Sequence, residues 1–209
     1  MMVPIDQLRR RRDGMIEAIS GGECLCLLDE EGLDCSGLAE GSLWDWENLM
    51  ELSHQAQERF AKRKALGLLS RRDYSMEELT QKLEQTVDRE SAERATCRMQ
   101  ELGLVDDRKY AGRLAKDLME RKCFAPSRVR RELIQKGIDR DVAHQAVELV
   151  EYCPERSISR IVEKKYGGVI EDEKKLRRVF SALQRYGYSA YEIWPALRSF
   201  LEEGLSEDE

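Results

Sequence analysis

The sequence predicts a mainly α protein, with three tandem three-helix repeats of helix-turn-helix type that follow a small β-element at the N-terminus. Three observations predict this fold. One residue pattern occurs three times, apolar residues recur at helical spacing from about residue 54 onward, and the composition is unusually charged. Charged residues make up 36% of the chain and Phe, Trp and Tyr only 7%. This balance suits helices with narrow apolar stripes and wide solvated faces.

The repeated pattern is the strongest of these observations. Each copy has an aliphatic residue, an arginine two positions on, an aromatic three positions later, a small residue, and apolar residues four and eight positions beyond the small one. Self-similarity of this kind indicates an array of one supersecondary unit, and it favours a long binding surface over a single active site. The three copies are Leu69, Arg71, Tyr74, Ser75, Leu79 and Leu83; Met119, Arg121, Phe124, Ala125, Val129 and Leu133; and Leu183, Arg185, Tyr188, Ser189, Ile193 and Leu197.

Composition also excludes several classes of protein. The 209 residues contain no run of about 18 apolar residues, so the sequence predicts no membrane span and a cytoplasmic location. Cys24, Cys26 and Cys35 form the one cysteine cluster, but a structural zinc site needs four ligands. We therefore expect free thiols in a reducing compartment, and neither a metal nor another cofactor.

The charge is distributed unevenly along the chain. Its formal net charge is −6. Residues 1–58 hold 4 basic and 13 acidic side chains, whereas residues 108–140 hold 11 basic and 4 acidic ones. Local charge decides what a surface attracts, so the basic middle predicts contact with a polyanion or an acidic partner in spite of the acidic total.

The first segment, residues 1–53, differs from the rest and reads as an acidic extension. Met15–Ile19 and Cys24–Leu28 have the composition of two short strands joined by a glycine turn. Asp29–Gly32 predicts a second turn. Apolar residues at helical spacing from Trp44 onward predict a helix that leads into the repeats.

The three repeats are expected over residues 54–103, 104–152 and 153–205, with a frayed tail over 206–209. Capping residues predict where their helices begin: Ser75, Asp139 and Ser189 each stand before an apolar stripe, and Pro126 suits the first turn of a helix. Pro195 predicts a kink or a later start of the last helix.

The recurring apolar residues are explained by packing alone. An aliphatic residue at one helix end, an aromatic at the turn and two aliphatics on the next helix suffice to join three helices around a small core. Burying a Leu or Phe side chain contributes roughly 2–3 kcal/mol. We expect a structural repeat core of Leu69, Tyr74, Leu79, Leu83, Met119, Phe124, Val129, Leu133, Leu183, Tyr188, Ile193 and Leu197.

The recurring arginines allow two interpretations. Arg71, Arg121 and Arg185 could each stabilise the carbonyl end of a helix, which is worth roughly 0.3–1 kcal/mol, or together form a ridge that faces an extended partner. Basic neighbours favour the ridge in the first two copies, whereas Arg185 has none and is better explained as structural. The candidate partner-binding or nucleic-acid-binding residues are Arg71, Arg72, Lys82, Arg108, Lys109, Arg113, Arg121, Lys122, Arg128, Arg130, Arg131 and Lys136.

Three stretches resemble the RecX family of bacterial recombination regulators, in the order found in that family. The stretch 65–83 (ALGLLSRRDYSMEELTQKL) resembles the family's opening repeat, 103–111 (GLVDDRKYA) its second hallmark, and 128–138 (RVRRELIQKGI) its third. The resemblance covers about residues 58–202, and the three motifs in series are specific although each alone is weak.

The resemblance implies a fold and a function. The fold is an elongated, curved array of three three-helix units. The partner is RecA, both as a monomer and as its filament on single-stranded DNA, in whose groove the protein would lie. The outcome is inhibition of RecA's ATP hydrolysis, strand exchange and coprotease activity, which modulates recombination, DNA repair and the SOS response. The resemblance brings no catalytic residues with it, so we expect a regulator and not an enzyme. We also expect the protein to be a monomer.

Two other interpretations remain open. A stand-alone, helix-turn-helix-like DNA-binding protein would bind DNA without RecA, with an affinity that falls steeply as salt rises. A helical scaffold for some other protein is the third. An enzyme is least favoured, because the sequence has no phosphate loop, no His paired with a carboxylate, and no nucleophile with an evident base.

Overall fold

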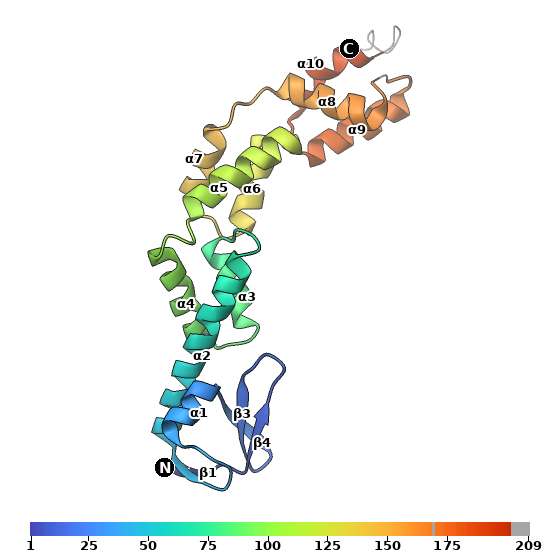
Figure 1. Cartoon of the computed structure of the whole chain (residues 1–209). Helices are drawn as coiled ribbons and strands as arrows, with labels where there is room; N and C mark the ends of the chain where they lie inside the picture. Colours follow the sequence, from blue (N-terminus) through green and yellow to red (C-terminus); the bar gives the residue numbers. More distant parts are fainter. Residues whose placement is uncertain (169, 202–209) are drawn as a thin grey trace. The chain divides into compact units, whose positions relative to one another are not determined.

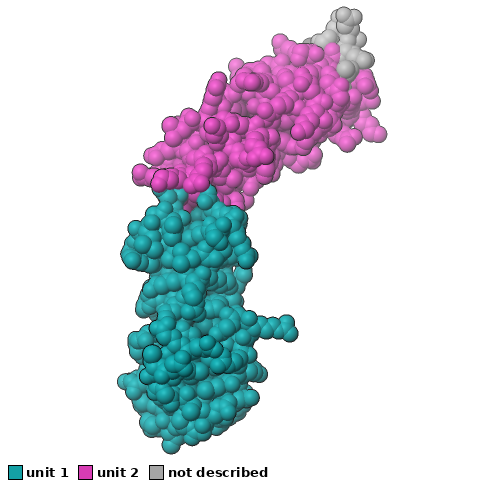
Figure 2. Space-filling view, in the orientation of Figure 1, with its two compact units in different colours: residues 1–106 teal, residues 107–209 magenta. Residues whose placement is uncertain are grey.

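The computed structural model describes residues 1–168 and 170–201, so the predicted tail over 206–209 lies outside the described residues. The fold is mainly helical with a small N-terminal sheet, as predicted (Figure 1). It divides into two compact units, which are residues 1–106 and 107–209 (Figure 2). No helix among the described residues is both long and apolar enough to cross a bilayer.

Unit 1 begins with two small antiparallel sheets. Strands β2 (Gln7–Arg10), β3 (Ile16–Ser20) and β4 (Glu23–Leu28) form one sheet in the order β2-β3-β4. The predicted glycine turn joins β3 to β4, with Gly21 and Gly22 at φ +57° and +84°, a region that glycine enters without steric cost.

A second sheet pairs β1 (Met2–Pro4) with β5 (Leu43–Asp45). Strands β1, β2 and β5 were not predicted, because each has only three or four residues and too short an alternation of apolar and polar residues to recognise.

The predicted turn over Asp29–Gly32 is wrong, because this segment starts a helix. Helix α1 (Glu30–Ser36) begins after Asp29, whose side chain accepts from the Gly32 amide at 2.9 Å. The aspartate is thus an N-cap. Helix α2 (Trp46–Leu69) follows β5 and is 24 residues long, so the proposed start of the first repeat at residue 54 lies within a continuous helix.

The rest of unit 1 is a three-helix bundle. Helices α3 (Met76–Glu84) and α4 (Arg89–Glu101) pack against α2 and share one apolar core with it. Ser75 caps α3 by accepting from the amide of Glu78 at 3.1 Å. The cap matches the one that the sequence predicts.

Unit 2 contains two three-helix groups. The first has α5 (Asp107–Lys116), which continues as the π-helix η1 (Asp117–Arg121), then α6 (Pro126–Gln135) and α7 (Arg140–Glu148). Pro126 occupies the first turn of α6, where a missing amide costs no hydrogen bond.

The second group of unit 2 has α8 (Pro154–Tyr166), α9 (Glu173–Arg185), α10 (Ala190–Leu197) and the 3₁₀ turn η2 (Arg198–Phe200). Pro195 lies inside α10, which begins at its predicted cap Ser189 and ends two residues after the proline.

The repeated apolar residues lie in three separate cores, one for each three-helix group. Ten of the twelve are buried, while Leu69 and Phe124 are half-buried against the same cores. A fourth apolar core lies between the small sheets and the start of α2. The acidic extension is thereby packed onto the long helix.

Candidate partner-binding surface

In unit 1 the predicted basic residues Arg71 and Arg72 lie in the turn after α2, and Lys82 lies in the last turn of α3; all three are exposed. The Arg72 guanidinium stacks 3.7 Å above the ring of Tyr74 and pairs with Glu78 at 3.6 Å. Stacking on an aromatic ring holds this guanidinium at the turn.

In unit 2 the predicted residues fall on three segments. They occupy helix α5, the end of η1, and helix α6 with its C-cap. Arg130, Arg128 and Lys136 are half-buried, and the others are exposed. The residues are Arg108, Lys109 and Arg113 on α5; Arg121 and Lys122 at the end of η1; and Arg128, Arg130, Arg131 and Lys136 on α6.

Arg128 ties the two helical groups of unit 2 together. Its guanidinium stacks 4.0 Å above the Phe124 ring, donates to the backbone carbonyl of Arg185, and pairs with Glu132 at 3.3 Å. Phe124 in turn meets the ring of Tyr186 edge-on, with centroids 5.3 Å apart. The contacts of Arg128 therefore account for its presence without an external partner.

The arginines of α6 do not share one face. Successive residues of an α-helix are rotated by about 100°, so Arg128 and Arg130 point to nearly opposite sides, and Arg131 lies between them. Arg131 is exposed. The basic run in the sequence thus divides between an internal tie and a solvated face.

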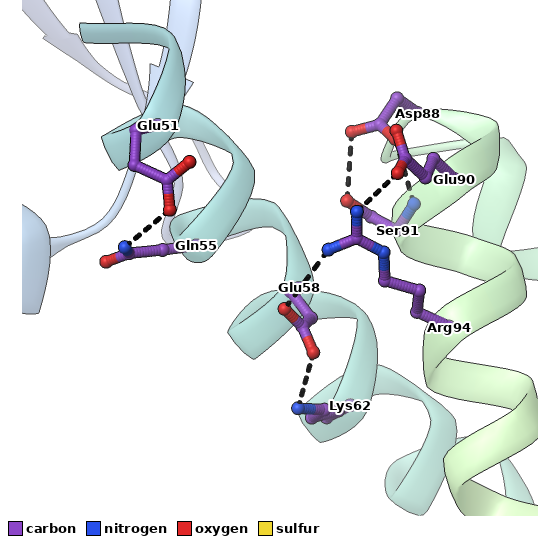
Figure 3. Close-up of polar contacts among 8 residues, drawn as sticks. All are labelled: Glu51, Gln55, Glu58, Lys62, Asp88, Glu90, Ser91 and Arg94. Atoms are coloured by element: carbon purple, nitrogen blue, oxygen red, sulfur yellow. Dashed lines mark hydrogen bonds and ion pairs between the residues drawn. The ribbon is translucent and has the colours of Figure 1, made fainter. Parts of the chain in front are cut away.

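Many cations elsewhere are neutralised by a carboxylate one helical turn away. Figure 3 shows the pattern between α2 and α4, where Glu58 accepts from Lys62 at 2.7 Å and pairs with Arg94 at 3.9 Å. Arg94 also pairs with Glu90 on its own helix. Exposed pairs of this kind contribute only about 0–1 kcal/mol, but they cancel the local charge that a polyanion would meet.

Sequence reasoning missed a basic row on α8. Arg156, Arg160 and Lys164 are four residues apart, so they lie along one face of the helix. The row escaped notice because residues 141–209 carry 10 basic and 14 acidic side chains, a net of −4, and this average hides it. The four-residue spacing was the available signal.

A pocket of about 580 Å³ lies beside this row, and we call it the α8 pocket. Its walls come from the end of η1 with the following turn, from α8, and from the C-cap of α9. The volume falls within the range of roughly 300–1,000 Å³ found for ligand sites. Its cationic lining residues are Arg121, Lys122, Arg160, Lys164 and Lys165.

The guanidinium of Arg160 is fixed in this wall. Its Nη2 donates to the backbone carbonyl of Glu120 and, at 2.6 Å, to Sγ of Cys123, while Nε donates to the same sulfur at 3.1 Å. Lys165 donates to the Tyr186 hydroxyl, and this hydrogen bond raises the pKa of the lysine. These hydrogen bonds within the protein hold both cations in place.

The turn beneath the pocket is held by a buried tyrosine. Cys123 has a φ of +56°, which is uncommon for a residue with a side chain. Its carbonyl accepts from the Tyr188 hydroxyl at 2.7 Å. Burial raises the pKa of Tyr188, so its hydroxyl keeps the proton that this hydrogen bond needs.

The six cysteines are free thiols in the structure. Within the described part of the chain, no three His, Cys, Asp or Glu side chains come together as a metal site would require.

The first helical group of unit 2 matches a known family model. A family model described as "RecX, second three-helix domain" matches residues 106–147. This span contains α5, η1 and α6 and nearly all of α7.

Two solved structures resemble the chain in fold. A crystal structure of regulatory protein RecX aligns with a TM-score of 0.58 and 19% identity over 90% of this chain and 96% of its own. The crystal structure of RecX from Lactobacillus salivarius aligns with a TM-score of 0.55 and 19% identity over 69% and 96%.

Curated relatives are similar in sequence over most of their length. The regulatory protein RecX of Trichlorobacter lovleyi is 35% identical over 130 residues, which cover 59% of this chain and 84% of the relative. That of Amycolatopsis mediterranei is 30% identical over 153 residues, 70% of this chain and 87% of the relative. With the three motifs, the helical repeats and these similarities together, the chain belongs to the RecX family of regulatory proteins.

Proposed function

We propose that this protein binds RecA and its filament on single-stranded DNA, and that it inhibits RecA's ATP hydrolysis, strand exchange and coprotease activity. The family membership supports a regulatory role. The resemblance of the three sequence motifs supports RecA as the partner. No chemistry is assigned to the protein itself; regulation comes from binding.

The observation that carries this proposal is the basic surface of unit 2. Arg131 on α6 and Lys122 after η1 are exposed, and neither has a carboxylate partner among the described residues. Cations that the fold leaves uncompensated attract acidic protein surfaces or phosphates. The repeated three-helix groups also suit a filament, because several weak contacts along a periodic partner combine through effective concentration.

The first test reverses charge on this surface. Lys122→Glu with Arg131→Glu should abolish inhibition of RecA's DNA-dependent ATP hydrolysis at sub-stoichiometric protein. Both side chains are exposed, so helicity and melting temperature should change little. The measurement is ATPase titration, with electron microscopy of the filaments.

A matched control makes the same change of charge elsewhere. Arg89→Glu with Arg94→Glu also reverses two exposed arginines, each of which pairs with a glutamate one turn away. It should inhibit like the wild type. If the first variant inhibits RecA as well as the control and the wild type do, the basic surface of unit 2 is not used. DNA binding in the absence of RecA, with no effect of the wild-type protein on RecA's ATP hydrolysis, would favour the stand-alone DNA-binding function.

A further inference from the structure

The α8 pocket is lined by five cations and by one carboxylate, Glu120, so its lining carries a net positive charge. Of its cations, Arg121 pairs with Asp117 at 2.9 Å. Within the described residues, Lys122 and Lys164 have no carboxylate partner, and the hydrogen-bond acceptors of Arg160 are a carbonyl and a thiol. Several positive charges that face one cavity raise the local concentration of anions far more than the same charges on a flat surface.

The pocket also has an apolar wall. Phe124, Ile161 and Tyr186 line it beside the cations. Ile161 is buried in the core of the second helical group, and the two aromatic rings lie edge to face. Because the Arg128 and Tyr188 contacts fix this wall and the turn below it, the cavity is formed without a ligand.

We propose that the α8 pocket binds a nucleotide, whose phosphate lies among Lys122, Arg160 and Lys164 and whose base packs against the wall of Phe124, Ile161 and Tyr186. Lysine ammonium groups supply charge at the rim, and the fixed guanidinium of Arg160 supplies a directed donor. The same chemistry serves a free nucleotide or one nucleotide unit of single-stranded DNA.

An acidic peptide fits the pocket less well. Carboxylates would be attracted by the three cations, but they would leave the apolar wall without a planar partner. Bases stack or pack on aromatic and apolar side chains, and each base contributes roughly 1–3 kcal/mol where it stacks on an aromatic ring. The combination of cations and an apolar wall therefore favours a nucleotide.

The experiment measures binding to the full chain without RecA, so its failure leaves the proposed regulation of RecA untouched. Isothermal titration would use four probes: ATP, inorganic tripolyphosphate, a twelve-residue oligothymidylate and a twelve-residue polyglutamate. The variant is Lys122→Ala with Lys164→Ala. The control is Arg140→Ala with Arg177→Ala, which removes two exposed cations of the same unit outside the pocket.

We expect ATP, the oligothymidylate or both to bind, and the pocket variant to weaken that binding at least tenfold while the control pair changes it less than twofold. If the oligothymidylate is the ligand, the slope of log K against log salt should become shallower by about 1.4, because each phosphate contact on a single strand contributes about 0.7. If ATP is the ligand, it should bind more tightly than tripolyphosphate, which has no base for the wall.

Four results would overturn the proposal. In the first, neither nucleotide probe binds; in the second, the pocket and control variants lose equal affinity. In the third, tripolyphosphate binds as tightly as ATP and the oligothymidylate does not bind. In the fourth, polyglutamate binds as tightly as the nucleotides. Thermal unfolding followed by circular dichroism would show that both variants are folded.

Discussion

At the residue scale, one ion pair fastens the N-terminal extension to the long helix. Asp29 accepts from Arg59 at both carboxylate oxygens, at 2.7 and 2.8 Å, and its side chain is 4% exposed. Arg59 lies 30 positions along the chain on α2. The sequence indicated neither the pair nor the helix that Asp29 caps, because no local pattern specifies a partner at that separation.

We predict that Asp29→Asn lowers the free energy of unfolding by about 2 kcal/mol. Asparagine still caps α1, so the loss reports the charge-assisted hydrogen bonds to Arg59. The measurement is urea unfolding followed by fluorescence of Trp44 and Trp46, with Trp194→Phe in every sample so that the signal comes from unit 1.

The matched control is Asp34→Asn, an exposed aspartate on the same helix. It should change the free energy of unfolding by less than about 0.5 kcal/mol. If the two substitutions have equal effects, the ion pair does not stabilise the extension.

The same pair predicts how acid acts on unit 1. The hydrogen bonds from Arg59 hold the pKa of Asp29 below its ordinary value. A lowered native pKa adds stability that is complete above the unfolded-state pKa and is lost as pH falls through the native one. The difference between wild type and Asp29→Asn should therefore be constant near neutral pH and disappear in acid below the native pKa of Asp29. A difference that persists there would contradict the assignment.

At the element scale, the positions of helix starts followed from single residues, but the approach of one helix to another did not. Ser75, Asp139 and Ser189 cap their helices as predicted, because an N-cap acts within its own first turn. The π-helix after α5 had no recognised signal. The close approach of the turn after α9 to the start of α6 involves residues 60 positions apart and was not predicted.

Gly187 makes that approach, and it gives a prediction at the same scale. It has φ +96°, and an added Cβ would lie 2.7 Å from Cβ of Arg128 and 2.9 Å from Oγ of Ser127. We expect Gly187→Ala to lower the free energy of unfolding by about 2–4 kcal/mol, through backbone strain together with overpacking. The measurement is urea unfolding followed by far-ultraviolet circular dichroism.

Gly167→Ala separates the two causes. Gly167 has φ +79°, but an added Cβ would meet nothing within 4 Å. Its substitution should cost only the backbone term, about 1 kcal/mol. Equal costs at the two glycines would mean that α6 moves aside easily and that the seam between the helical groups is loose.

At the scale of the whole molecule, the repeats predicted the helical architecture, but charge counts predicted which cations are exposed only in part. Averages over long segments identified the basic stretch 108–140 and hid the row on α8. The run on α6 also overstated the exposed charge, because Arg128 is engaged between helical groups. Which cations face solvent depends on helix phase and packing partners, and neither is contained in a charge count.

A partner that spans both units should respond to changes in each. Arg71→Ala with Lys82→Ala removes charge from unit 1, and Lys122→Ala with Arg131→Ala removes it from unit 2; all four side chains are exposed. Each pair alone should raise the concentration needed for half-inhibition of RecA's ATP hydrolysis several-fold.

A quadruple variant, which combines all four substitutions, decides whether one partner contacts both units. Effects of changes that share no contacts add as free energies, so its half-inhibition concentration should rise by the product of the two separate factors, to within about threefold. This product is expected only if both units contact the same filament at once, because each lost contact then weakens the same bound state. The half-inhibition concentration of the quadruple variant could instead be no higher than that of the less effective double variant. That result would confine the interaction to a single unit and leave the other unit without a part in inhibition.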